Sequence, residues 1–117
     1  MHYMETTLWN KAMALAEQAC RGVVRLPSEE RYGIRLQITR AAVSVASNIA
    51  EGWTRESKSE RRQFLAIAHG SLSELHTQLL LCSRLNWLPP ESLTVSFGLI
   101  DEISRMLTTL RQRSRTP

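Results

Sequence analysis

The side chains best suited to metal binding or nucleophilic chemistry are two histidines and two cysteines. His69 and His76 stand seven residues apart, which in a helix separates them by about 10 Å along the axis, too far to share one metal ion. Neither forms a Glu-x-x-His pair of the kind that builds di-iron sites in bundles. Cys20 and Cys82 fall on or beside apolar stripes, where a thiol acts as a small hydrophobe. We expect no metal, cofactor or catalytic residue, and an enzyme using His69 or His76 stays a third hypothesis.

Arginine dominates the basic side chains. Of the 15 Lys and Arg residues only Lys11 and Lys58 are lysines, in a chain of 117 residues with net charge +4. The planar guanidinium binds phosphate and carboxylate through two hydrogen bonds, where Lys acts as a point charge. An antiparallel bundle would bring one group of cations to the same end, and we predict it as a nucleic-acid surface: Arg55, Lys58, Arg61, Arg62, Arg111, Arg113 and Arg115. The alternative is that these cations only complement helix dipoles and keep the protein in solution.

Four helices would position these residues. Proline and polar breaks fall at Pro27, at the polar run 54–59 and at Pro89. Ser57 and Glu60 form a capping box at the start of the third helix. Apolar residues recur at steps of three and four, as in a bundle seam. The pattern predicts a single all-α domain over 1–117, an antiparallel up-down-up-down four-helix bundle with helices at about 6–25, 28–53, 58–87 and 91–113.

The second helix has more apolar surface than one core requires. A stripe that includes Val43 lies beside a second stripe that includes Ala41 and Val45, and together they span roughly 220°, about twice the arc of a surface helix. We therefore predict that this helix carries the interface with further copies of the chain, with partly buried polar members. The candidate interface residues are Arg40, Ala41, Val45, Asn48 and Glu51. The alternative is a monomer whose second helix is merely rich in alanine.

Composition restricts the setting of the protein. Hydrophobic residues make up 43% and charged residues 22%, which is typical of a folded chain rather than a disordered one. No apolar run approaches the ~18 residues of a membrane span, and we expect no secretory signal. Two cysteines cannot form a disulfide scaffold, so a reducing, cytoplasmic location is expected.

Several stretches carry a family resemblance. Residues 40–45 (Arg-Ala-Ala-Val-Ser-Val) and 47–52, with the specific run Asn-Ile-Ala-Glu-Gly, resemble a bacterial four-helix-bundle family encoded in intervening sequences of large-subunit ribosomal RNA genes. Further matches lie at 30–34, at Arg55, Ser57, Lys58 and Glu60, at most positions of 64–81 other than His76, and at 102–107. This chain departs from the family pattern in having Thr39 before Arg40, where the family has two adjacent arginines. The departure removes a charge from the second helix and weakens the case that its polar face, which carries Arg40, binds phosphate.

The resemblance implies an antiparallel bundle that assembles as a homopentamer, in the bacterial cytoplasm, with no known catalytic activity. A related branch serves diversity-generating retroelements as accessory proteins, which bind nucleic acid and a reverse transcriptase. The resemblance thus implies self-association, RNA or DNA as a partner, and a reverse transcriptase or other protein as a further partner. We expect a non-enzymatic homo-oligomer that binds RNA or DNA through arginine-rich surfaces. The alternative is a structural or protein-interaction module with no nucleic-acid role.

Overall fold

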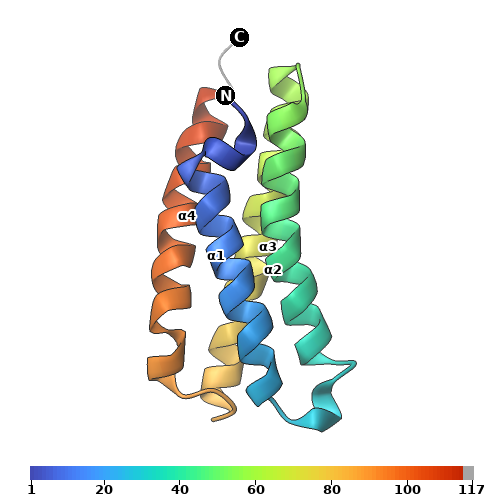
Figure 1. The fold of residues 1–117 in the computed structure, drawn as a ribbon, viewed down its shortest axis with the longest axis vertical. Coiled ribbons are helices and arrows are strands. Elements are labelled where there is room, and N and C mark those ends of the chain that lie inside the picture. Colours follow the sequence, from blue (N-terminus) through green and yellow to red (C-terminus); the bar gives the residue numbers. More distant parts are fainter. Residues whose placement is uncertain (115–117) are drawn as a thin grey trace.

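Four long helices run antiparallel in the computed structural model, which describes residues 1–114 (Figure 1). They are α1 (Thr7–Gly22), α2 (Ile34–Thr54), α3 (Lys58–Arg84) and α4 (Thr94–Arg113). Short 3-10 turns precede α1, follow it, and lead into α2 and α4. No strand occurs in the described part of the chain. The predicted all-α four-helix bundle is confirmed.

Helices that follow one another in the sequence pack together, and α4 also packs against α1. In Figure 1, α1 lies in front and α3 behind, with α2 and α4 on either side. This order places the end of α2, the start of α3 and the end of α4 at one end of the bundle. The end of α1, the start of α2, the end of α3 and the start of α4 lie at the other.

The start of α3 lies where the sequence predicted it, whereas α2 begins at Ile34 rather than at residue 28. The Ser57 hydroxyl accepts a hydrogen bond from the Glu60 backbone N–H at 3.0 Å, as the capping motif predicts. Residues 28–30, predicted as the first turn of the second helix, instead form a separate 3-10 turn. The helix begins only after Gly33, whose backbone has an irregular ψ of -116°. A side chain at Gly33 would meet the Glu30 carboxylate at 2.8 Å.

One cluster of buried aliphatic side chains joins all four helices. Its fully buried members include Leu15 on α1, Ile38 on α2, Leu72 on α3 and Ile103 on α4. Burying such a side chain contributes about 1.5–3 kcal/mol relative to leaving it in water. The bundle is therefore held chiefly by its interior.

The contact between α2 and α3 is the most extensive in the bundle, and small residues permit it. Near the connection between the two helices, a Cβ atom at Gly52 would lie 3.1 Å from the Phe64 Cβ. Two turns away the Ser44 and Ser71 hydroxyls are hydrogen-bonded at 2.8 Å. The two backbones therefore approach closely along this edge.

Within residues 1–114, no helix is long and apolar enough to cross a membrane.

Candidate functional site

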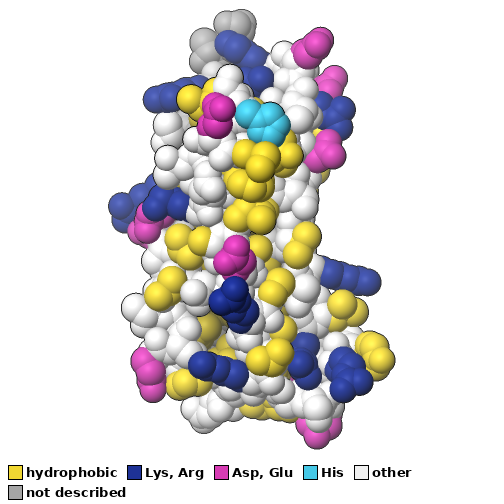
Figure 2. All heavy atoms as spheres, in the orientation of Figure 1, with side chains coloured by type: hydrophobic (Ala, Val, Ile, Leu, Met, Phe, Trp, Pro, Cys, Tyr) yellow, Lys and Arg dark blue, Asp and Glu magenta, His cyan; other side chains and the backbone are white. Residues whose placement is uncertain are grey.

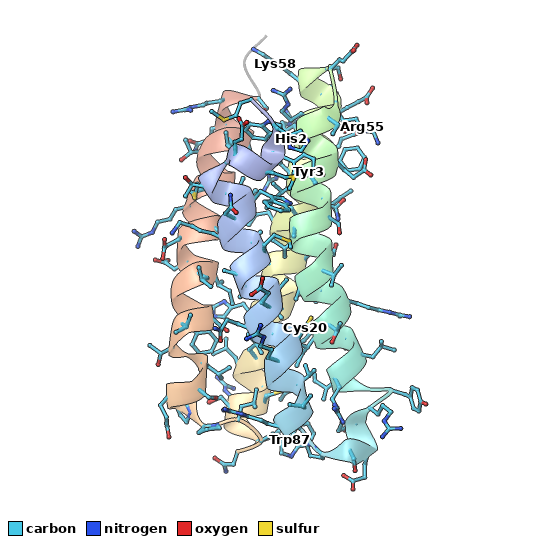
Figure 3. All side chains as sticks on the ribbon, viewed as in Figure 1. His2, Tyr3, Cys20, Arg55, Lys58 and Trp87 are labelled. Atoms are coloured by element: carbon cyan, nitrogen blue, oxygen red, sulfur yellow. The ribbon has the colours of Figure 1, made fainter. Side chains whose placement is uncertain are left out.

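The structure gathers the predicted basic residues at one end of the bundle. Arg55 follows α2, Lys58, Arg61 and Arg62 open α3, and Arg111 and Arg113 close α4. We call these six residues the arginine end. Figure 3 shows Arg55 and Lys58 at the end of the molecule opposite Trp87. Arg115, the seventh predicted member, lies outside the described residues.

Arg55 is held in place by two groups of its own chain. Its Nη2 donates to the Glu51 Oε2 one turn earlier, at 2.9 Å. Its guanidinium also lies over the Phe64 ring, with the central carbon 4.7 Å from the ring centroid, a cation–π contact. Arg55 is therefore held at the junction of α2 and α3 by these two contacts, and its guanidinium is only partly available to an incoming ligand.

Arg61 caps the C-terminal end of α2 through a hydrogen bond to the backbone. Its Nη2 donates to the Arg55 carbonyl oxygen at 3.1 Å. Carbonyls at a helix C-terminus lack intrahelical partners, and a cation there also complements the helix dipole. For Arg61 the dipole and capping role, offered as the alternative in the sequence analysis, is therefore visible in the structure.

Arg111 is bonded to His69, a contact that the sequence did not suggest. The Arg111 Nη1 lies 3.0 Å from the His69 Nδ1, and the His69 Nε2 lies 3.0 Å from the Ser104 Oγ. Since a guanidinium can only donate, Nδ1 accepts and the proton of neutral His69 sits on Nε2. Burial, and then the positive charge of Arg111, lowers the pKa of His69 below its ordinary value of 6.5. His69 thus orients Arg111 between α3 and α4.

The remaining three cations face solvent. Lys58, Arg62 and Arg113 are exposed and make no side-chain hydrogen bond or ion pair within residues 1–114. Glu56 and Glu60 are exposed at the same end and partly offset the positive charge. The arginine end therefore divides into an inner set with intramolecular partners and an outer set without them.

The predicted assignment of the α2 stripes is wrong for two residues. Ala41 and Val45, expected to contact a further copy, are 4% and 0% exposed and lie in the core of the single chain. The close contact with α3 turns this edge of α2 inward, where Ser44 bonds Ser71. The excess apolar surface belongs instead to the neighbouring stripe, where Val43 is 47% exposed.

The other three interface candidates stay predictions. Asn48 is half-buried and donates to both the carbonyl and the hydroxyl oxygen of Ser44. Arg40 and Glu51 are exposed in the single chain, and Glu51 bonds Arg55. Asn48 is therefore already hydrogen-bonded within its own helix, whereas Arg40 has no partner in residues 1–114.

Exposed apolar side chains follow the outer edge where α1 and α2 meet. Figure 2 shows hydrophobic side chains gathered down the middle of this face. We call the exposed members the apolar strip: Met13, Val24, Tyr32, Leu36 and Val43. Cys20 is half-buried on the same side of α1 (Figure 3). Exposed apolar side chains of this kind are candidates for an interaction surface.

The described residues give little support to metal or thiol chemistry. Within residues 1–114, no three His, Cys, Asp or Glu side chains are grouped so as to hold a metal ion. His76 packs edge-on against Phe97, with ring centroids 5.5 Å apart, on the side of α3 that faces α4. Burial, and then the charge of Glu30, raises the pKa of the Cys82 thiol, which disfavours the thiolate.

The chain matches one family profile, and its fold matches solved structures, one of which is described below. The sequence profile described as "23S rRNA-intervening sequence protein" matches residues 4–109. A crystal structure from Bacteroides thetaiotaomicron, described as a protein of unknown function from the S23 ribosomal protein family, is 21% identical. It superposes with a TM-score of 0.82 over 91% of this chain and 99% of its own, which supports the fold. No curated protein matches the sequence.

Proposed function

Because the chain belongs to the 23S rRNA-intervening sequence protein family, we propose that it is a non-enzymatic, self-associating bundle that binds RNA or DNA through the arginine end. One observation carries the nucleic-acid part. Lys58, Arg62 and Arg113 stand exposed at one end, without partners in residues 1–114, beside arginines that are already fixed.

The outer cations suit the phosphate backbone rather than the bases. Lys and Arg that neutralise phosphates release condensed counterions, so affinity falls steeply with salt and depends little on sequence. The fixed inner arginines add positive potential without having to be ordered on binding. Assembly of several chains with their arginine ends together would repeat this charge around a ring.

The decisive experiment compares two triple variants that remove the same charge from opposite ends. We expect Lys58→Gln/Arg62→Gln/Arg113→Gln to reduce retention on RNA and on single-stranded DNA by about tenfold or more at about 50 mM salt. The matched control, Arg21→Gln/Arg25→Gln/Arg84→Gln, should retain most of the binding. All six side chains are exposed, so neither variant should unfold.

Either of two results would overturn the nucleic-acid proposal: no binding by the wild-type protein at about 50 mM salt, or equal losses in both triple variants. Equal losses would mean that only net charge matters. Arg111 is left out of the triple variant because Arg111→Gln would break its hydrogen bond to His69 as well as remove a charge.

The apolar strip supports self-association, and we expect the pentamer that the family resemblance implies. Val43→Glu introduces a charge on the strip, whereas Val95→Glu makes the same change at an exposed position of α4. Light scattering should show a smaller assembly for Val43→Glu only, at unchanged helical content. A wild-type mass near 13.3 kDa would contradict any oligomer.

If the protein self-associates but retains no nucleic acid, the second candidate applies: a structural or protein-interaction module. The apolar strip is the observation that favours it. A reverse transcriptase or another protein, proposed from the family resemblance, would then be the partner. Loss of its binding in Val43→Glu, with retention in Val95→Glu, would support that reading.

A further inference from the structure

The end of the bundle opposite the arginine end contains a cavity of about 200 Å³. It opens where α1 ends and α4 begins, and its apolar wall includes Ile38, Leu79 and Leu88. A side chain at Gly22, on the margin of the cavity, would meet nothing within 4 Å. The cavity therefore has both an apolar wall and an open polar margin.

The side chain of Ser96 lines this cavity. Ser96 is only 4% exposed, and its Oγ makes no hydrogen bond within residues 1–114. Elsewhere on α4, Thr108 and Thr109 bond the carbonyl one turn earlier. The Ser96 Oγ is not among the fully buried atoms that lack a partner, so it is open to the cavity and is available to a ligand there.

Two arginines stand at the margin of the same cavity. Arg21 lies in the last turn of α1, Arg25 ends the 3-10 turn that follows, and both residues line the cavity. Both are exposed and make no ion pair or side-chain hydrogen bond in the described part of the chain. No Asp or Glu among the described residues lines the cavity. An anion bound here would relieve the repulsion between the two guanidinium groups.

We propose that this cavity binds a small organic oxyanion, a carboxylate or phosphate monoester on a short apolar body. Arg21 and Arg25 would donate to the oxyanion, and the Ser96 hydroxyl would donate to it from within. The apolar body would lie against Ile38, Leu79 and Leu88. The cavity volume of about 200 Å³ suits a small ligand of this kind rather than a nucleic-acid chain.

The site is independent of the proposed nucleic-acid surface. The two lie at opposite ends of a bundle whose longest extent is 47 Å. The Arg21→Gln/Arg25→Gln variant should therefore lose the small anion and keep nucleic-acid retention. The Lys58→Gln/Arg62→Gln/Arg113→Gln variant should behave in the opposite way, so failure of either proposal can be recognised separately.

The test is calorimetric titration of the full chain with phenyl phosphate and with benzoate, which distinguish the two oxyanion heads. We expect saturable binding of at least one probe, weakened about tenfold or more in Arg21→Gln/Arg25→Gln. Ser96→Ala should weaken binding to a smaller extent, with a thermal melt confirming that it folds. Benzamide, which keeps the ring without the charge, should not bind.

The matched control is Arg31→Gln/Arg35→Gln, a pair with the same spacing at the same end that does not line the cavity. It should bind the probe within about twofold of wild type. No saturable binding of either probe at millimolar concentration would overturn the proposal. So would equal weakening by both arginine pairs, or inorganic phosphate binding as tightly as phenyl phosphate.

Discussion

At the arginine end, Arg55, Arg61 and Arg111 are fixed by a carboxylate, a backbone carbonyl and a histidine. At the cavity end, Arg21 and Arg25 have no such partner in the described residues and stand at the margin of a cavity that Ser96 also lines. The two ends thus use the same residue type for different purposes. The number of arginines at a surface does not give the charge available to a ligand, because neighbouring groups determine which guanidinium groups are already engaged.

The backbone is closely packed around Gly52 at the arginine end and open around Gly22 at the cavity end. Alanine substitutions at these two glycines should give the largest difference in stability between the ends. Gly52→Ala should lower the free energy of unfolding by about 1–3 kcal/mol, because the new methyl group meets Phe64 at the α2–α3 contact. Gly22→Ala has open space and a helical backbone, and should raise it by about 0.4–1 kcal/mol. Urea denaturation of the two variants measures both signs. Equal effects on the free energy of unfolding would show that the arginine end is no more tightly packed than the cavity end.

The capping role of Arg61 gives the next largest effect. We expect Arg61→Gln to lower the free energy of unfolding by about 1 kcal/mol, since it removes the donor to the Arg55 carbonyl from a half-buried site. Arg25→Gln, at the cavity end, should change it by less than about 0.5 kcal/mol. Chemical denaturation at one pH compares them. A larger loss for Arg25 would reverse the contrast between fixed and unpartnered arginines.

The His69–Arg111 bond predicts a pH dependence confined to the arginine end. Because the pKa of His69 is lowered on folding, the unfolded chain binds a proton that the folded chain does not. The stabilisation by neutral His69 is complete above 6.5 and is lost as the pH falls through its lowered folded pKa.

Denaturation of wild type and His69→Gln between about pH 8 and about pH 5 isolates this contribution, since the other titrating groups are common to both. The stability difference between them should shrink or reverse toward acid pH. A difference that is constant with pH would mean that His69 does not accept from Arg111.

The smallest effect is expected at Arg105, which lies on α4 between the two ends. It pairs with Asp101 at 3.0 Å, but its side chain is 80% exposed. Such a surface pair contributes little, so Arg105→Ala should change the free energy of unfolding by less than about 0.5 kcal/mol and leave nucleic-acid retention unchanged. Denaturation and retention measured together check this. A clear loss of retention would extend the binding surface beyond the arginine end.

Much of the fold was predictable because its signals are local. The Ser57 cap and the three- and four-residue steps of apolar residues each depend on a few neighbours in sequence. The start of α2 was misplaced because Ser28 and its following acids also suit a 3-10 turn. The gathering of the basic residues at one end was predictable from chain direction, since successive helices of an up-down bundle alternate.

The candidate sites were predictable only in part. Sequence spacing gave no sign that Arg111 bonds His69, because the two residues are 42 positions apart. The cavity was also missed, since Arg21 and Ser96 come together only when α1 and α4 are packed. Both features join distant elements, and neither follows a local period.

The sequence by itself determined the number of helices, their approximate ends and the excess of apolar surface on the second helix. Only the tertiary structure decided which stripe of α2 is buried. Two stripes of comparable hydrophobicity permit either rotation of the helix, and the close contact of Gly52 and Ser44 with α3 selects one. That rotation places Val45 in the core and leaves Val43 at the surface, because only one edge of α2 is narrow enough for two backbones to approach.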